Sequence, residues 1–429
     1  MKKRTYNEIK QKIANNTAVV LTVQELIKKL KDGENVKFED VDVITTATKA
    51  LMSGIAGIFS FRLTPPKKIR KFIKVSLNGI VAFPGPCPNE FLGIVDLILY
   101  GTSHSITIEN YSGGMLFRDL VEGKTIQVCA EGENGEKLER EITLDDMQFA
   151  RMMGTRQAIK NYFAMINPSQ DSVSTIFSVL PLVGNKKQIT FSGCGAMNPF
   201  QNDPGAKVLG VGTKILVNGS EGYIFGPGTR NDRLKPNMQT IADFKGMKPE
   251  YMGAFKTSYG LENICSIAVP IPILNEEIFN QIIKSDFDVP LVILNVVGRN
   301  KLGQISYGDV WDDNFYVSFN PDVCKECKEC EIIGKCPTNA FTTKNGIITS
   351  IDRTRCFNCG TCVFICSKNA FECDLKTISF EGEDIPIVLR QSDRFNAIKL
   401  AKELKNFILK GMFELKEPTG NLNFYPKVF

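Results

Sequence analysis

Two cysteine runs decide the fold of this chain: CKECKECEIIGKCP at residues 324–337 and CFNCGTCVFIC at residues 356–366. In each run three cysteines are separated by two residues, and a fourth follows after a longer gap. Successive short gaps wrap a loop around a metal–sulfur cube, and in two-cluster proteins the fourth, remote cysteine binds the other cube. The runs therefore predict two [4Fe–4S] clusters that lie side by side.

The exchange of the fourth cysteine assigns the ligands. One cluster is predicted to use Cys324, Cys327, Cys330 and Cys366, and the other Cys356, Cys359, Cys362 and Cys336. The tails of the runs repeat each other, since CPTNAF at 336–341 is echoed by CSKNAF at 366–371. Zinc sites also use cysteines two residues apart. The doubled triple spacing and the repeated tail favour clusters, on a module typical of bacterial two-cluster ferredoxins.

The residues after the cysteine runs predict how this module is placed in the chain. Residues 385–389 form an apolar run typical of a strand, and Ser392 begins a predicted helix with apolar residues at helical spacing. A ferredoxin module needs neither element. We therefore expect a body at 1–311, an inserted two-cluster module at 312–378, and a return of the chain to the body at 379–429.

The body itself predicts an α+β fold, a mixed α/β unit without regular alternation of strands and helices. Capping boxes at Thr5 and Thr22 predict two helices near the start, and Thr143 is predicted to cap a third. Residues 264–270 and 289–297 are apolar runs typical of buried strands.

Composition excludes several classes of partner. The net charge is only +5 and no basic stripe runs through the chain, which excludes a nucleic-acid partner. No apolar stretch reaches the roughly 20 residues that span a membrane. Most of the 13 cysteines stand at metal-ligand spacing, so we expect free thiols in a reducing, cytoplasmic setting.

Candidate catalytic residues lie outside the cysteine runs. Cys87 stands among prolines in a stiff loop, Cys194 lies between two glycines that leave the sulfur open, and Cys129 ends an apolar strand. Each is a candidate sulfur carrier, with simple packing as the alternative. His104 is the only histidine, and its setting of small polar residues makes it a candidate general acid or base. A structural histidine is the alternative.

Two similar glycine turns, GVGTK at 210–214 and GPGTR at 226–230, are candidate anion sites. Such turns can aim backbone N–H groups at a carboxylate, sulfonate or phosphate, with a cationic side chain beside them. The alternative is two ordinary hairpin turns, and neither matches a nucleotide-binding fingerprint. The residues predicted to hold the substrate anion are Gly210, Gly212, Thr213, Lys214, Gly226, Gly228, Thr229 and Arg230.

Several segments resemble the archaeal homocysteine-biosynthesis family, whose members are aspartate-semialdehyde sulfurtransferases. The resemblance is carried by the two glycine turns and by residues 6–13, 41–48, 142–146 and 401–405. The added cluster module narrows it to the methanogenesis marker 16 metalloproteins of methanogenic archaea. Ser53 stands where the sulfurtransferases carry a cysteine, and Cys129 lies a few residues from the place of a second. The resemblance thus implies that a sulfur-carrying cysteine here would be Cys87, Cys129 or Cys194.

The resemblance implies an iron–sulfur enzyme that reductively adds sulfur to a small anionic aldehyde. The leading candidate reaction is sulfoacetaldehyde to coenzyme M, ahead of aspartate semialdehyde to homocysteine. The implied partners are a sulfide or persulfide donor and an external low-potential electron donor, and a homo-oligomer stays open. The alternative is an electron-delivery or assembly factor for another metalloenzyme of methanogenesis.

Overall fold

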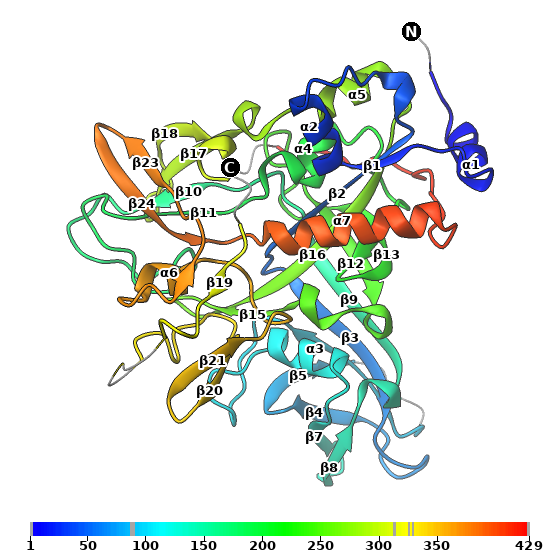
Figure 1. Ribbon diagram of the computed structural model, residues 1–429. Helices are drawn as coiled ribbons and strands as arrows, with labels where there is room; N and C mark the ends of the chain where they lie inside the picture. Colours follow the sequence, from blue (N-terminus) through cyan, green and yellow to red (C-terminus); the bar gives the residue numbers. More distant parts are fainter. Residues whose placement is uncertain (1–2, 86–90, 312–314, 325–326, 328–329, 427–429) are drawn as a thin grey trace.

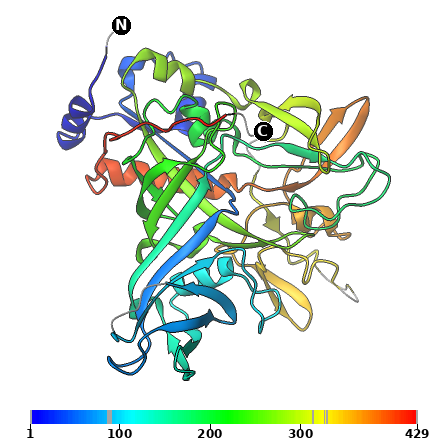
Figure 2. The same ribbon diagram turned by 180° about the vertical axis from the view of Figure 1, so that it is seen from behind.

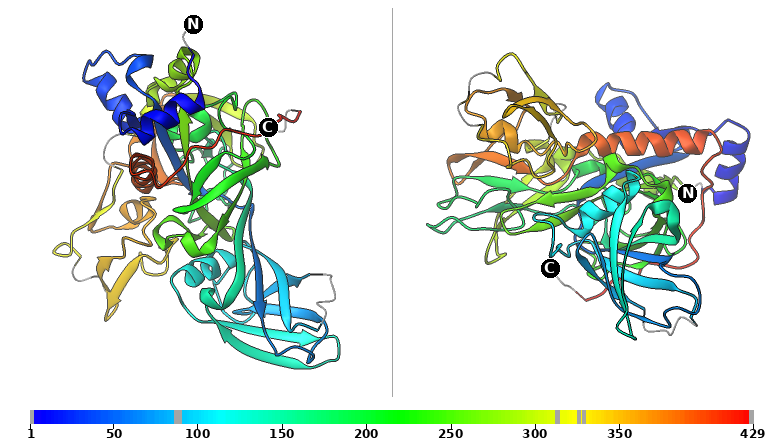
Figure 3. Two further views of the ribbon diagram at one scale, coloured as in Figure 1. Left: turned by 90° about the vertical axis from the view of Figure 1, so that its right-hand side faces the viewer. Right: turned by 90° about the horizontal axis from the view of Figure 1, so that it is seen from below.

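The computed structural model describes residues 3–85, 91–311, 315–324, 327 and 330–426. It mixes helices and strands, with 19% of residues in helices and 36% in strands. Figure 1 shows an upper part that carries the N-terminal helices and the long helix α7, and a lower lobe built from β4, β5, β7 and β8. The cysteine-rich segment lies to one side of both, as Figure 3 shows.

The larger sheet joins the upper part to the lower lobe. Its strand order is β1-β2-β16-β12-β13-β14-β9-β3-β6-β5-β4-β7-β8, and β15 pairs with β16. Among the described strands of this sheet only β1 and β2 pair in parallel. The long strands β3 and β9 run side by side into the lower lobe (Figure 2). The bounds are β1 Val20–Thr22, β2 Val43–Leu51, β3 Ile55–Arg62, β4 Phe72–Leu77, β5 Ile80–Pro84, β6 Ile94–Tyr100, β7 Ile126–Gly132, β8 Lys137–Ile142, β9 Met147–Gln157, β12 Lys214–Val217, β13 Ser220–Pro227, β14 Met238–Asp243, β15 Gly253–Lys256 and β16 Leu261–Pro272.

A second sheet has the order β18-β17-β10-β11-β24-β23. Strand β24 of this sheet follows the cysteine-rich segment and pairs in parallel with β11, which precedes that segment in the chain. The sequence predicted this strand at 385–389. The bounds are β10 Ala164–Ile166, β11 Ile189–Phe191, β17 Pro290–Asn295, β18 Lys301–Ser306, β23 Thr377–Phe380 and β24 Glu383–Arg390.

The helix predicted from Ser392 is α7, Arg394–Leu409, and Asp393 caps it by accepting a hydrogen bond from the Asn396 N–H group. Its buried residues recur at helical spacing and pack on β2 and β16 (Figure 3). The Thr45 hydroxyl of β2 donates to the Ala401 carbonyl at 2.9 Å. Both elements that follow the cysteine-rich segment therefore contact strands of the N-terminal part.

Both predicted N-terminal capping boxes are present, at the starts of α1, Tyr6–Ala14, and α2, Val23–Lys31. The helix predicted after Thr143 is wrong. Its capping box closes a single 3-10 turn, Leu144–Asp146, and the chain then becomes β9. From Ala150 to Gly154 every second residue of β9 is buried, which suits a strand held between β14 and β3. The remaining α-helices are α3 Gly113–Val121, α4 Pro199–Asn202, α5 Glu276–Ile282 and α6 Thr361–Ile365.

The cysteine-rich segment has its own small apolar core of Val317, Ile332, Ile348, Ala370 and Phe371. Two short ladders frame it: β19 Ser318–Phe319 pairs with β22 Phe371–Glu372, and β20 Phe341–Lys344 forms a hairpin with β21 Ile347–Ile351.

The sequence repeat of this segment is also a structural repeat. Asn339 and Asn369 are both left-handed, with φ of +50° and +53°. One residue further on, the Ala340 N–H group donates to the Cys336 sulfur at 3.3 Å, and the Ala370 N–H group to the Cys366 sulfur at 3.5 Å. Both fourth cysteines therefore sit in the same kind of turn.

Candidate functional site

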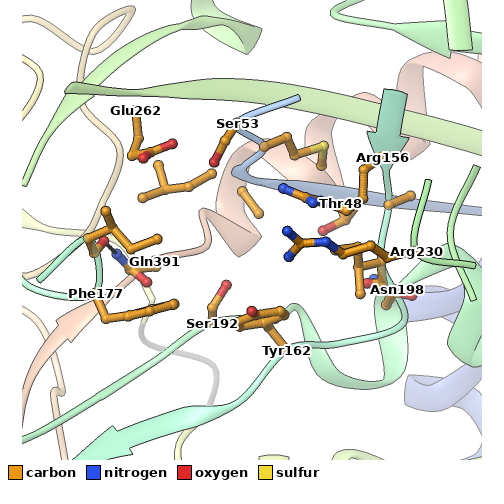
Figure 4. Close-up of a pocket in the computed structure, with 17 residues that line it drawn as sticks. Thr48, Ser53, Arg156, Tyr162, Phe177, Ser192, Asn198, Arg230, Glu262 and Gln391 are labelled. Atoms are coloured by element: carbon orange, nitrogen blue, oxygen red, sulfur yellow. Dashed lines mark hydrogen bonds between the residues drawn. The ribbon is translucent and has the colours of Figure 1, made fainter. Parts of the chain in front are cut away.

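A pocket of about 150 Å³ opens where β2 ends, beside the β2–β3 turn and the loop after β11. Figure 4 shows polar side chains entering it from several elements that are far apart in the chain. The lining residues are Thr48, Ala50, Leu51, Met52, Ser53, Arg156, Ala158, Ile159, Tyr162, Ile176, Phe177, Ser192, Gly193, Asn198, Arg230, Glu262 and Gln391.

Two guanidinium groups enter this pocket from the same side (Figure 4). Arg156 lies at the end of β9 and Arg230 at the end of the second glycine turn. Burial, and then the charge of Arg230, lower the pKa of Arg156. Two neighbouring cations repel each other unless an anion sits between them, so this side of the pocket is suited to a carboxylate or sulfonate.

A carboxyl group lies across the pocket from Arg230, next to Ser53 (Figure 4). It belongs to Glu262 near the start of β16, and its Oε2 atom is buried without a hydrogen-bond partner. Burial raises the pKa of Glu262, while a hydrogen bond from Ser53 and the charge of Arg156 act in the opposite direction. The pocket thus has a cationic side and a side with a carboxyl group.

The loop Ser192–Asn198 forms the floor, and its backbone is held by buried side chains. The Tyr307 hydroxyl donates to the Ser192 carbonyl at 2.7 Å, and the Trp311 indole N–H donates to the Gly193 carbonyl at 3.0 Å. The Ser392 hydroxyl accepts from the Gly193 N–H group at 2.7 Å. The loop is therefore fixed before any ligand arrives.

The two glycines of this loop serve close packing. Gly193 has φ of +125° and Gly195 has φ of +62°. A Cβ atom would lie 2.2 Å from the Tyr307 hydroxyl at the first position and 2.2 Å from Asp286 Oδ1 at the second. The expectation that they leave the Cys194 sulfur open is wrong, because Cys194 is completely buried. Side chains from other elements fill the space that the glycines leave.

Cys194 nevertheless adjoins the pocket wall. The Thr48 hydroxyl donates to its sulfur at 3.4 Å, and both Thr48 and Gly193 line the pocket. Burial raises the pKa of Cys194 more strongly than its hydrogen bonds lower it. Cys194 is therefore expected to stay a protonated thiol. It follows Gly193, which lines the pocket, but it does not line the pocket itself.

The other candidates from the sequence lie elsewhere. Cys129 is on β7 in the lower lobe, opposite Ser76 of β4. His104 is exposed between β6 and α3, and Cys87 lies outside the described residues. Neither Cys129 nor His104 lines the pocket.

The two glycine turns have similar sequences but lie at different positions in the structure. The Gly228 and Thr229 N–H groups donate to the Asn237 and Thr155 carbonyls, and the Gly212 N–H group donates to the Ile224 carbonyl. These N–H groups are therefore not directed at an anion, contrary to expectation. Arg230 reaches the pocket through its side chain.

The first turn packs instead against the C-terminal segment. A Cβ atom on Gly210 would lie 2.4 Å from the Gly420 carbonyl oxygen. The Gly210 N–H group donates to the Thr213 hydroxyl, and Lys214 pairs with Glu221 at 2.6 Å. None of the four predicted residues of this turn lines the pocket, whereas Arg230 of the other turn does.

The eight cysteines of the two runs line two cavities. The outer cavity is lined by Cys324, Cys327, Cys330 and Cys366, and the inner cavity by Cys336, Cys356, Cys359 and Cys362. Charge effects connect the same groups: burial raises the pKa of Cys359 to about 12, and the neighbouring Cys336 and Cys356 add to this. Burial raises the pKa of Cys324 as well, with Cys330, Cys366 and Cys327 adding to it.

Four cysteines around one space are the donor set of a four-iron cube. Among the described residues, no three His, Cys, Asp or Glu side chains are grouped to hold a single metal ion. The outer cavity measures about 270 Å³ and the inner about 20 Å³. A cube in the inner cavity therefore requires its cysteine side chains to turn outward. The donor set fits in number and type in both.

The inner cavity is close to the pocket. Phe177 of the pocket wall packs in one apolar cluster with Phe357 and Cys359. The Cys359 carbonyl accepts from the Arg390 N–H group at 2.9 Å, and the next residue, Gln391, lines the pocket.

A buried ion pair makes a further connection. The Asn358 amide donates to Asp393 Oδ1 at 3.1 Å, and Lys49 pairs with the other oxygen of Asp393 at 2.9 Å. The side chains of Lys49 and Asp393 are 3% and 0% exposed. Because Thr48 lines the pocket, this pair links the second cysteine run to the pocket wall.

The fold and the site together describe a mixed α/β body with a pocket that carries two guanidinium groups, beside two cavities of four cysteines each. Comparison with known proteins gives the family. A family model described as "Homocysteine biosynthesis enzyme, sulfur-incorporation" matches residues 18–415, and the chain belongs to this family. No helix in the described ranges is long and apolar enough to cross a membrane.

Three relatives illustrate the range of the family. An uncharacterized protein of Methanocaldococcus jannaschii is 42% identical over 402 residues, covering 92% of this chain and 98% of the relative. One of Methanothermobacter thermautotrophicus is 39% identical over 411 residues, covering 96% and 94%. The L-aspartate semialdehyde sulfurtransferase of Methanocaldococcus jannaschii is 30% identical over 305 residues, covering 68% of this chain and 58% of that enzyme. No solved structure gives a significant match.

Sequence reasoning missed Arg156, Glu262 and Gln391 as pocket residues. One signal was present for Glu262, because a lone carboxylate stands near the start of a long apolar run. Lys49 stands in β2, a strand that is buried along almost its whole length, and its partner Asp393 lies 344 residues away. Charged residues inside apolar strands mark buried pairs or sites.

Proposed function

We propose that this chain is an iron–sulfur enzyme that adds sulfur to a small anionic aldehyde and reduces the adduct to a thiol. The overall change is R–CHO + H₂S + 2e⁻ + 2H⁺ → R–CH₂–SH + H₂O. The leading substrate is sulfoacetaldehyde, which gives coenzyme M, and aspartate semialdehyde is the second choice. Family membership and two relatives named L-aspartate semialdehyde sulfurtransferase support sulfur incorporation into an aldehyde.

The observation that carries the choice of substrate is the pair of guanidinium groups in one small pocket. Arg156 and Arg230 repel each other, and an anionic head group between them relieves this repulsion. Guanidinium groups bind carboxylates and other oxyanions through paired hydrogen bonds. The pocket of about 150 Å³ suits a head group on a short carbon chain. The reacting carbon then lies toward Ser53, Glu262 and the floor loop.

Two routes bring sulfur to that carbon. In one, free sulfide enters the pocket and attacks the carbonyl. In the other, a persulfide on a cysteine does so, and Cys194 is the candidate beside the pocket among the described residues. Its raised pKa works against a thiolate. We therefore favour free sulfide and keep Cys194 as the second route.

We further propose that the outer and inner cavities hold the two [4Fe–4S] clusters, on a ferredoxin-type insert at 312–378 like that of the marker 16 metalloproteins. When bound, these clusters supply the two electrons singly, from an external low-potential donor. The inner cysteines adjoin the pocket through Phe177 and Gln391, which supports delivery to the substrate. The body at 1–311 and the return at 379–429 then form the catalytic part.

The test is an anaerobic assay of purified, iron-loaded protein with sulfide, titanium(III) citrate and one aldehyde at a time. We expect thiol from sulfoacetaldehyde, less from aspartate semialdehyde, and none from acetaldehyde, which lacks an anion. Arg230→Met should abolish the preference for the anion, and Lys214→Met, from the other glycine turn, should keep it. Absence of thiol from every aldehyde would replace the enzyme with the electron-delivery alternative.

A further inference from the structure

Glu262 is the one side chain of the pocket with an unsatisfied buried oxygen, among the residues that the structure describes. Its Oε2 atom has no hydrogen-bond partner, and Figure 4 shows its carboxyl group pointing into the cavity beside Ser53. A carboxylate with one oxygen buried and unpaired costs free energy that a neutral carboxyl group avoids. The position therefore favours a protonated side chain that faces the space for the substrate.

A fully buried acid elsewhere in the chain shows that the environment of the half-buried Glu262 is unusual. Asp203 is 1% exposed, but its carboxylate accepts hydrogen bonds from the N–H groups of Lys207, Val208 and Leu209 at 2.8–2.9 Å. Three donors fix that carboxylate as a structural acceptor. Glu262 has instead a hydroxyl group on one side and the open pocket on the other. A structural role explains Asp203 and leaves the free oxygen of Glu262 unexplained.

We propose that Glu262 is the proton donor of this pocket, positioned by Ser53 to protonate the carbonyl oxygen of the aldehyde while sulfur adds. This proposal rests on the proposed function. As HS⁻ attacks, the C–S bond forms and the carbon–oxygen π bond breaks. The oxygen takes the proton of Glu262, which leaves a hydroxythiol that is uncharged at the reacting carbon and a carboxylate on Glu262. No electrons are transferred in this step, and Glu262 recovers its proton from solvent before the next addition.

The arrangement of charges supports this role. The head group is held by Arg156 and Arg230 on one side, and Glu262 lies on the opposite side (Figure 4), so the donor faces the aldehyde end of a short substrate. The charge of Arg156 also acts on Glu262. It stabilises the carboxylate that forms when the proton leaves.

The rival role for Glu262 is to bind an ammonium group, which aspartate semialdehyde carries and sulfoacetaldehyde does not. An α-ammonium group lies one carbon from the carboxylate that the guanidinium groups would hold. It would therefore lie on the cationic side of the pocket, away from Glu262. The geometry favours a proton donor, and the rival is one outcome of the test.

The first experiment needs no turnover. Infrared difference spectra of wild-type protein at neutral pH should show the carbonyl stretch of a protonated carboxyl group that is perturbed by 2-hydroxyethanesulfonate. Glu262→Gln should remove this band, whereas Glu139→Gln on exposed β8 should keep it. Absence of the band in wild-type protein overturns the proposal whatever the activity. This measurement on unaltered protein decides the matter even where Glu262→Gln fails to fold.

The second experiment uses the thiol-forming assay. General acids typically contribute 10²- to 10⁴-fold, so Glu262→Gln should lower kcat at least about 100-fold with little change in KM. The wild-type rate should fall as pH rises through the pKa of Glu262, because only the protonated form donates, and this alkaline limb should vanish in the variant. A loss confined to KM for aspartate semialdehyde overturns the proposal in favour of ammonium binding. If Glu262 is protonated but no aldehyde yields a thiol, the proposed function is refuted, and the role of Glu262 as proton donor is refuted with it.

Discussion

The outer and inner cysteine cavities come from repeated sequences but meet different surroundings. In the outer cavity Cys327, Ser367 and Lys368 are exposed, and Ile333 nearby is 42% exposed. In the inner cavity Phe357, Asn358 and Cys359 are buried. The repeat encodes the loop around each cavity, and the contacts of the second run with the body decide which cavity becomes internal.

Those contacts involve both apolar and charged groups. Phe357 packs against Phe255 with ring centroids 5.2 Å apart, and the Lys49 ammonium group lies 5.5 Å from the centroid of its ring. Asn358 hydrogen-bonds Asp393 at the start of α7. If the cavities hold clusters as proposed, the difference predicts a direction: electrons would enter at the outer, exposed cavity and leave from the inner one, next to the pocket.

The largest expected effects come from removing one cysteine from each cavity. Cys359→Ala and Cys327→Ala should each lower the iron content from about eight atoms to about four. Cys359→Ala should abolish thiol formation with any reductant, because the inner cavity adjoins the pocket. Cys327→Ala should keep measurable activity with titanium(III) citrate, a small reductant that reaches an inner cluster directly. Equal losses in both variants would refute the proposed direction.

The next largest effect concerns the ion pair that ties the inner run to the body. Asp393→Asn leaves the Lys49 ammonium group buried without its charged partner, and breaking such a pair typically costs about 3–5 kcal/mol of folding free energy. We expect that loss in chemical denaturation under anaerobic conditions. Glu381→Gln, which breaks the exposed pair with Lys186, should cost less than about 1 kcal/mol. A small effect at Asp393 would mean that the inner run does not depend on this pair.

The cysteine segment was predictable from sequence because its information is local. Spacing of two residues and a repeated tail predicted which cysteines share a space, and the two cavities are lined by those same groups. Strand β24 and helix α7 were also predictable, because each is a continuous apolar pattern. Such local patterns predict the structure correctly when no contact with a distant segment favours another conformation.

The pocket was not predictable, because its residues come from elements that only the fold brings together. Arg156, Arg230 and Glu262 lie on three separate strands or turns, and no spacing connects them. The two glycine turns have similar sequences. Arg230 of the second turn reaches the pocket only because of where the fold places that turn. The helix expected after Thr143 failed similarly, because the place of β9 between two strands overrides a local capping box.

A bound ligand should distinguish the inner cavity from the outer one. Binding of 2-hydroxyethanesulfonate beside Arg156 and Arg230 should perturb the electron paramagnetic resonance signal of one reduced cluster, the inner one, and leave the outer signal unchanged. Arg230→Met should weaken this binding by roughly 10- to 100-fold, since hydrogen bonds to charged groups contribute about 1.5–3 kcal/mol. Lys214→Met is the matched control and should bind normally. Perturbation of the outer signal alone would reverse the assignment of the two cavities.

The last prediction concerns two lysines, one half-buried near the pocket and one exposed at the outer cavity. The Lys235 ammonium group donates to the Asn161 and Tyr162 carbonyls, the latter at 2.9 Å. Burial, followed by the charge of Lys160, lowers the pKa of Lys235 to about 7. Lys368 lines the outer cavity and is exposed.

Linkage gives the sign of the pH effect. Between about pH 7 and the unfolded pKa of about 10.4, the unfolded chain holds a proton on Lys235 that the folded chain has lost. The free energy of unfolding should therefore rise with pH in this window, by at most about 1.4 kcal/mol per pH unit from this group. Lys235→Met should remove that slope, and Lys368→Met should leave it unchanged, as measured by denaturant unfolding at several pH values. An unchanged slope in Lys235→Met would show that this lysine keeps its proton in the folded protein. The region near the pocket would then be no more sensitive to pH than the outer cavity.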